Sequence, residues 1–132
     1  LKAVQLHGNE SADYCKEIKL TGVEVIKAFG VNEHFDFSKL VPYLAGVNYF
    51  LFDTQTPQHG GSGKVFDWKL LQNYTLNTPY FLSGGIDVDH AANINEMNDP
   101  RLYALDINSK FEITPGLKDV EKLKKFKTLV TL

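Results

Sequence analysis

Five short apolar runs, each followed by a segment typical of a helix, constrain the fold of this 132-residue chain more than any other feature. Strands that are covered on both faces read as continuous apolar stretches, so these runs predict buried strands. The predicted strands are Ala3–Leu6, Glu24–Phe29, Tyr49–Phe52, Tyr80–Ser83 and Leu102–Ile107. Strict alternation of strands and helices indicates βα units, and we therefore predict an α/β fold with one parallel sheet.

Helices are predicted between and after these strands. Asn9, Glu10 and Ser11 offer side chains that cap a helix running to about Lys19. Further helices are predicted at Phe37–Leu44 with Ser38 as a cap, at Trp68–Asn73, at Val88–Met97 and at Asp119–Leu129. The segment that follows the last strand and runs through Pro115-Gly116 is interpreted as a loop.

The composition excludes several classes of protein. With 14 basic and 16 acidic residues and a net charge of −2, nothing favours binding to nucleic acid or to a membrane surface. Cys15 is the chain's one cysteine, which excludes an internal disulfide and fits a reducing compartment, so a cytoplasmic location is expected. We interpret Cys15 as a packing residue, and residues 1–132 as one domain.

Polar side chains and glycines follow the predicted strands. They are His7, the loop after Phe29, Asp53, Gly84-Gly85, and Asp106 with Ser109. Because the carboxyl ends of parallel strands meet on one face, this pattern predicts a ligand site there. A partly desolvated Asp53 suits a general acid, although a lone Asp also serves as a helix cap or as a lysine's partner.

The glycine-rich stretch after Asp53 has two interpretations. GGSGK resembles a nucleotide P-loop, but Gln58 and Val65 stand where that motif requires glycine and a hydroxyl residue. Gly61 and Gly63 still allow backbone N–H groups to approach a ligand, and a plain surface loop is the alternative. Lys27, inside a strand, either points into a polar crevice or is an edge or barrel-mouth lysine paired with a carboxylate.

Several motifs resemble one enzyme family. VQLHGNE, LFDT, GGSGKVFDW, FLSGGI, and DINSKFE followed by PGLKD are similar to phosphoribosylanthranilate isomerases of tryptophan biosynthesis. The family fold is a (β/α)8 barrel, and the resemblance begins at its fourth strand. The chain therefore looks like the C-terminal portion of such a barrel, with about five of its eight units.

The resemblance also implies roles for particular residues. The reaction is an Amadori rearrangement of a phosphoribosyl-anthranilate substrate without a metal or cofactor. Asp53 matches the general acid, Asp106 a residue that binds a sugar hydroxyl, and His7 a residue lining the site. The phosphate seat is matched by Gly84, Gly85, Asn108 and Ser109, with help from Gly61 and Gly63.

Two expected residues of the family are missing from this sequence. The opening motif with the cysteine base is absent, and Arg101, the only arginine, does not match the arginine that holds the anthranilate carboxylate. We therefore expect the chain to lack a general base, to be inactive alone, and to pair with N-terminal βα units or with a second copy. The alternatives are a self-sufficient α/β domain that only binds a phosphorylated ligand, and another phosphate-binding barrel enzyme such as a lyase or epimerase.

Overall fold

The computed structural model describes residues 3–54, 68–84, 91–106, 112–114 and 117–118. Within them, five parallel strands form one sheet in the order of the chain. They are β1 (Ala3–Leu6), β2 (Glu24–Gly30), β3 (Tyr49–Asp53), β4 (Tyr80–Ser83) and β5 (Leu102–Asp106). The α/β class, the parallel sheet and all five predicted strands are confirmed. The strand ends within the described residues differ by one residue at most, and Ile107, the predicted end of the fifth strand, lies outside them.

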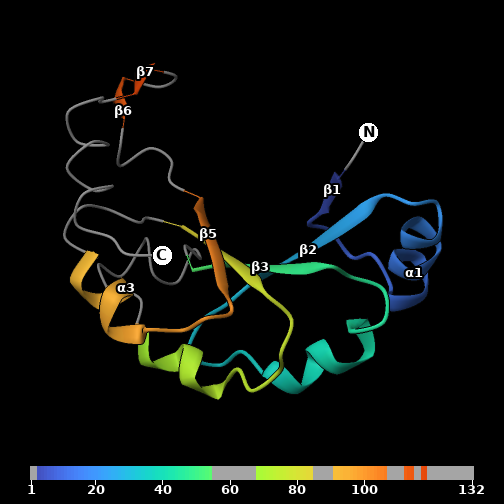
Figure 1. Cartoon of the computed structure of the whole chain (residues 1–132), viewed down its shortest axis with the longest axis horizontal. Coiled ribbons are helices and arrows are strands. Elements are labelled where there is room, and N and C mark those ends of the chain that lie inside the picture. The colour runs from blue at the N-terminus through green and yellow to red at the C-terminus, as the bar shows by residue number, and fades with distance from the viewer. Residues whose placement is uncertain (1–2, 55–67, 85–90, 107–111, 115–116, 119–132) are drawn as a thin grey trace.

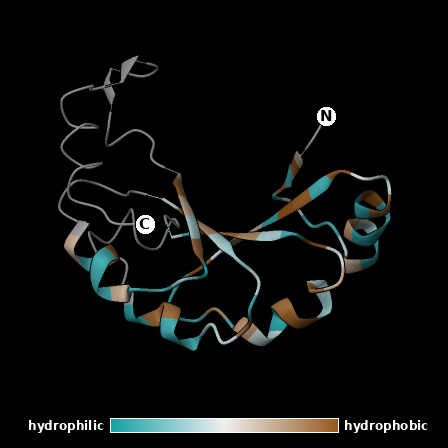
Figure 2. Cartoon of the chain, in the orientation of Figure 1, coloured by the Kyte–Doolittle hydropathy of each residue, from teal (hydrophilic) through white to brown (hydrophobic). Residues whose placement is uncertain are grey.

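Helices connect the strands and lie along one side of the sheet (Figure 1). They are α1 (Ala12–Leu20), the 3-10 helices η1 (Phe37–Tyr43) and η2 (Trp68–Asn73), and α3 (Ala91–Met97). Each carries both hydrophobic and hydrophilic residues (Figure 2), as a helix with one face on a sheet requires. The predicted helix at Asp119–Leu129 and the first residues of the one predicted from Val88 lie outside the described residues.

The helix caps follow local chemistry. Ser11 caps α1 as predicted, because its hydroxyl accepts the Tyr14 N–H at 3.1 Å. The predicted Ser38 cap of η1 is wrong. Asp36 is the cap, and its carboxylate accepts both the Ser38 N–H at 3.0 Å and the Ser38 hydroxyl at 2.7 Å. Pro42 lies inside η1 and has no N–H for a helical hydrogen bond, consistent with the tighter 3-10 form.

The main core lies between the sheet and the helices. Phe50 and Phe52 of β3 point to this side, and Tyr74 covers Phe52 with ring centroids 5.1 Å apart. Cys15 of α1 is fully buried in the same core, which confirms its interpretation as a packing residue. Burial raises the pKa of the Cys15 thiol, so the thiol is held in its neutral form.

The opposite face of the sheet carries three aromatic rings from different strands. The Tyr49 ring lies 5.4 Å from that of Phe81 and 4.8 Å from that of Tyr103, centroid to centroid. Tyr103 nevertheless remains 58% exposed. Among the described residues, β1 and β5 each pair with one neighbour only, so the sheet has an open edge at both ends.

Strand β5 contains a β-bulge beside Tyr103. Tyr80 pairs with Leu102, whereas the next residue, Phe81, pairs with Ala104. The extra residue shifts the register of the rest of β5 by one place. Beyond β5, the interpretation of a plain loop is wrong in part, since β6 (Glu112–Thr114) and β7 (Leu117–Lys118) form a small antiparallel pair. Within the described residues, no helix is long and apolar enough to cross a membrane.

Candidate active site at the carboxyl ends of the strands

The ends of four strands are level with one another. Gly30 of β2 pairs with Asp53, Asp53 pairs with Ser83, and Ser83 pairs with Asp106. Asp53 and Asp106 are therefore two strands apart at the same height, a backbone separation of about 10 Å. The sheet brings these two predicted acids together at its carboxyl edge, as the strand pattern predicts.

Asp53 lies on the face of the sheet that is turned away from the helices. Successive side chains of a strand point to opposite faces, and Phe52 is buried in the helix-side core. The Asp53 side chain is half-buried. The backbone carbonyl oxygen of Asp53 accepts a hydrogen bond from the Val31 N–H at 2.8 Å. This bond ties the end of β3 to the loop that follows β2.

Thr54 is a structural residue that the sequence analysis missed. Its side chain is 2% exposed, and its hydroxyl shares its proton between the carbonyl oxygens of Ser83, at 2.9 Å, and Gly84, at 2.8 Å. The Thr54 N–H also donates to the Ser83 carbonyl at 2.9 Å. Thr54 therefore fixes the turn after β4 from the neighbouring strand. The signal in the sequence that could have found it is a hydroxyl residue directly after a strand-terminal acid.

Gly84 is the one residue of the predicted phosphate seat that the structure describes. Its φ of +98° lies in the left-handed region, which a side chain would strain. The other members of that seat, Gly85, Asn108 and Ser109, lie outside the described residues, as do Gly61 and Gly63 of the glycine-rich loop. For Asp106 the structure gives the backbone position alone.

His7 follows β1 at the same edge and is exposed. The loop that carries it is held by Lys27, whose Nζ donates to the Gly8 carbonyl at 2.9 Å and lies 3.2 Å from Glu10 Oε1. Lys27 is 2% exposed and points to the helix side, with Nζ 4.8 Å from the centroid of the Phe29 ring. The pairing of Lys27 with a carboxylate is confirmed.

The Glu10 carboxylate is matched to this environment. Desolvation by itself would raise the pKa of Glu10. Hydrogen bonds from the N–H groups of Gly8 and of Glu10 itself, together with the Lys27 ammonium, outweigh it, so the pKa lies below its usual value. Glu10 thus remains ionised beside the buried lysine at neutral pH.

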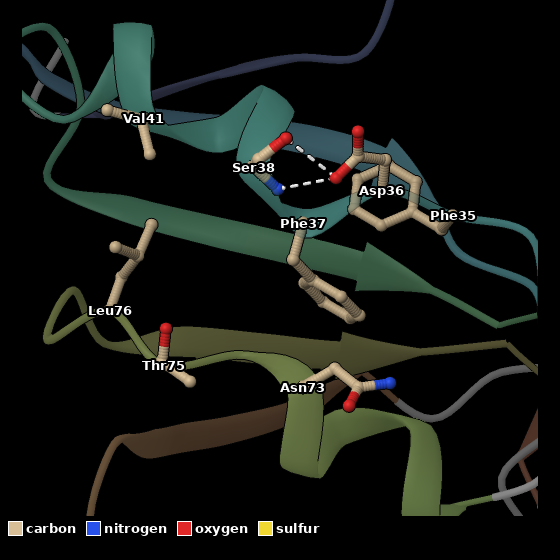
Figure 3. A pocket seen from close by; sticks show the side chains of 8 residues that line it. All are labelled: Phe35, Asp36, Phe37, Ser38, Val41, Asn73, Thr75 and Leu76. Carbon is tan, nitrogen blue, oxygen red and sulfur yellow. Dashed lines mark hydrogen bonds between the residues drawn. The ribbon is translucent and has the colours of Figure 1, made fainter.

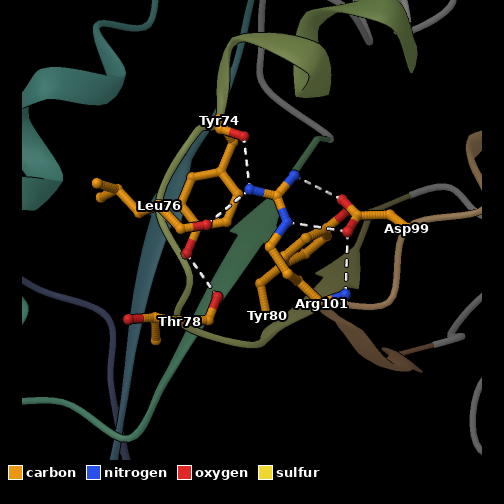
Figure 4. Close-up of polar contacts among 6 residues, drawn as sticks. All are labelled: Tyr74, Leu76, Thr78, Tyr80, Asp99 and Arg101. Carbon is orange, nitrogen blue, oxygen red and sulfur yellow. Dashed lines mark hydrogen bonds and ion pairs between the residues drawn. The ribbon is translucent and has the colours of Figure 1, made fainter.

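The amino ends of the strands hold a second polar cluster, around Arg101 (Figure 4). Its Nε donates to Asp99 Oδ1 at 2.9 Å and its Nη2 to Asp99 Oδ2 at 2.9 Å. Its Nη1 donates to the carbonyls of Tyr74, at 2.7 Å, and Leu76, at 2.6 Å, and the Tyr80 hydroxyl donates to Asp99 at 2.8 Å. Arg101 is fully used as a structural residue far from the predicted site.

A cavity of about 460 Å³ lies between η1 and the segment after η2, on the helix side of the sheet (Figure 3). Phe37 and Val41 line it from one wall and Asn73 and Leu76 from the other. Among the predicted site residues that the structure describes, none lines this cavity. Among the described residues, no cluster of three or more His, Cys, Asp or Glu side chains offers a metal site.

Five parallel strands that alternate with helices, with acids level at one carboxyl edge, define a barrel-type α/β scaffold. The sequence model described as N-(5′-phosphoribosyl)anthranilate (PRA) isomerase matches residues 1–128. The chain belongs to this family.

Relatives and solved structures agree with this assignment. The N-(5′-phosphoribosyl)anthranilate isomerase of Parabacteroides distasonis is 48% identical over 126 residues, which cover 96% of this chain and 57% of that protein. The crystal structure of phosphoribosyl anthranilate isomerase from Thermus thermophilus matches with a TM-score of 0.73 and 29% identity, over 98% of this chain and 60% of that one.

A further solved structure of a phosphoribosyl anthranilate isomerase holds reduced 1-(o-carboxyphenylamino)-1-deoxyribulose 5-phosphate. It matches with a TM-score of 0.68 and 30% identity, over 96% of this chain and 57% of that one. The chain thus spans somewhat less than two thirds of the length of the proteins it matches.

Proposed function

We propose that this chain supplies the general acid and the phosphate seat of a phosphoribosylanthranilate isomerase. The observation that carries the proposal is the placement of Asp53 at the carboxyl edge, level with Ser83 and Asp106, in a chain of this family. The substrate class is an anthranilate joined to a ribose 5-phosphate, in keeping with the product analogue in the related crystal structure.

In the proposed reaction, Asp53 protonates the furanose ring oxygen and the ring opens to a Schiff base. A base then removes the proton from C2 of the sugar, and the resulting enolamine becomes the ketone of the product. In the last step the C2 hydroxyl loses its proton and C1 gains one, so the product is an isomer of the substrate. The proton that the acid gives to the ring oxygen is matched by the proton that the base takes from C2. Asp106 binds a sugar hydroxyl, and the turn at Gly84 offers its backbone to the phosphate.

The base is proposed to come from N-terminal βα units that complete the barrel. Cys15, the only thiol of the chain, is fully buried among the helix-side side chains and so is not available as the base. The open edges of β1 and β5 and the exposed ring of Tyr103 offer surface for such units to pair with and cover. On this proposal the chain is inactive alone.

The test combines the chain with the N-terminal βα units of the Parabacteroides distasonis relative, as a fusion and as two separate chains. Loss of phosphoribosylanthranilate is followed by its anthranilate fluorescence. Turnover is expected in the combined sample and not in either part alone. Tight binding of the product analogue by the chain alone, with no turnover in any combination, would contradict the proposal and favour the binding-domain alternative.

Within an active combination, Asp53→Asn is expected to lower kcat by about 10²-fold or more, since it removes a positioned acid. Asp13→Asn is the matched control, because Asp13 is an exposed carboxylate in the first turn of α1. Equal kcat values for the two variants would show that Asp53 is not the acid.

A further inference from the structure

Lys27 is a buried lysine that acts outside its own βα unit. It lies in β2, opposite Leu6 of β1 and Phe50 of β3, yet its ammonium reaches the loop that follows β1. A buried charge is costly unless hydrogen bonds and an opposite charge satisfy it. Here the Gly8 carbonyl at 2.9 Å, the Ala28 carbonyl at 3.3 Å and the Glu10 carboxylate at 3.2 Å do so.

The Gly8 residue is held from both sides by this arrangement. Its carbonyl accepts from Lys27, and its N–H donates to Glu10 Oε1 at 2.9 Å, the same oxygen that faces the Lys27 ammonium. Gly8, Glu10 and Lys27 therefore form a closed ring of charge-assisted hydrogen bonds. The Tyr43 hydroxyl of η1 donates to the Glu10 carbonyl at 2.9 Å and fixes the ring to the helix layer.

The ring controls the residue next to it in sequence. The Gly8 N–H belongs to the peptide plane that joins His7 to Gly8, so the bond to Glu10 fixes the backbone angle at which His7 leaves β1. A Cβ on Gly8 would lie 3.0 Å from Glu10 Oε2, which shows how closely the carboxylate folds over this residue. The side chain of His7 is exposed, but the backbone that carries it is thus fixed by the hydrogen bonds of Gly8.

We propose that Lys27 and Glu10 are positioning residues that set His7 at the carboxyl edge of the sheet. Lys27 touches no ligand itself, since it points to the helix side and its ammonium contacts protein groups and the rings of Phe29 and Tyr43. It acts through the Gly8 backbone, and it couples two neighbouring βα units because the anchor and the loop belong to different strands. The catalytic consequence of this placement rests on the proposed function, whereas the placement itself does not.

The first experiment measures amide exchange at Gly8 by NMR in the 132-residue chain. Lys27→Met is expected to speed exchange at Gly8 by about 10-fold, because loss of the ammonium releases Glu10 from the N–H. Lys16→Met is the matched control on an exposed lysine of α1, and Lys27→Arg is expected to retain most of the protection. Unchanged exchange at Gly8 in Lys27→Met would overturn the proposal.

The amides of Phe50–Phe52 in β3 report whether each variant still folds. If Lys27→Met loses their protection, Glu10→Gln decides instead, since it keeps an acceptor for the Gly8 N–H and removes the charge that Lys27 faces. Faster exchange at Gly8 alone in Glu10→Gln supports the ring, and exchange equal to that of the unchanged chain overturns it.

The second experiment measures kinetics in an active combination of the chain with N-terminal units. Lys27→Met is expected to raise KM by about 5-fold with little change in kcat, because His7 is placed as a binding residue. In a His7→Ala background the same change is expected to add nothing, since both act through one side chain. Independent, additive effects would overturn positioning through His7. A combination without turnover would refute the proposed function, and the exchange experiment would still decide on Lys27.

Discussion

The two ends of the sheet use the same chemistry for different purposes. At the carboxyl end, Lys27 pairs with Glu10 and holds the carbonyl of Gly8. At the amino end, Arg101 pairs with Asp99 and holds carbonyls of the segment after η2. Both cations fix a loop, but only the Lys27 loop carries a predicted site residue. A buried ion pair therefore says little about function until the end of the strand on which it lies is known.

The largest expected effect is on stability and separates the two pairs. Arg101→Met leaves the Asp99 carboxylate, 11% exposed, without its cation and is expected to cost about 3–5 kcal/mol of unfolding free energy. Lys27→Met leaves Glu10, 23% exposed, which water reaches more easily, and is expected to cost about 1–2 kcal/mol. Urea unfolding of the two variants measures both values. A larger loss for Lys27→Met would reverse the comparison.

Alkaline pH should weaken the amino end through its tyrosines. Burial raises the pKa of Tyr74 to about 12, and burial together with the bond to Asp99 raises the pKa of Tyr80 further. Because the unfolded chain ionises tyrosine near pH 10, the stability from Tyr74 is complete below pH 10 and is lost as pH rises to about 12.

This loss is expected to amount to about 1–3 kcal/mol for Tyr74. Urea unfolding at pH 8, 10 and 11 tests it. The unfolding free energy is expected to depend less on pH in Tyr74→Phe, and Tyr14→Phe, at an exposed tyrosine, is the control. If the unfolding free energy depends on pH equally in Tyr74→Phe and in the unchanged chain, the loss of stability at alkaline pH arises from another group.

The smallest expected effect compares two glycines that have nearly the same φ and lie at opposite ends of the strands. Gly84 has φ +98° at the carboxyl edge, and Gly22 has φ +92° in the turn before β2. Alanine at either position is expected to cost about 1 kcal/mol of stability from backbone strain. Only Gly84→Ala should weaken binding of the product analogue in an active combination, as measured by calorimetry. Equal affinities for the two variants would remove Gly84 from the phosphate seat.

The sequence alone predicted the parts of the fold that depend on local pattern. The apolar runs located all five strands, and the order of strands and helices placed Asp53 and Asp106 at one edge. The sequence did not predict the hydrogen bonds between side chains of one element and the backbone of another. The bond from Thr54 to the turn at Gly84 and the reach of Lys27 across to Gly8 join residues 30 and 19 positions apart.

Two local errors have physical causes of the same kind. Asp36 and Ser38 are both good helix caps, and which one acts depends on the backbone conformation at the start of η1 rather than on residue type. The segment that contains β6 and β7 lacks a long apolar run. Its strands of three and two residues are too short to show the alternation that predicts a strand.

The bulge beside Tyr103 sets the position of Asp106 along the sheet, opposite Ser83. If the same sequence paired with β4 without a bulge, Phe81 would face Tyr103 and Ser83 would face Leu105, leaving Asp106 one position beyond its present partner. The level alignment of Asp53 and Asp106 along the sheet is thus decided in the middle of β5, well below the edge where these acids are proposed to act. Regular pairing through Tyr103 would therefore displace Asp106 from the level of Asp53 without changing a residue at the carboxyl edge.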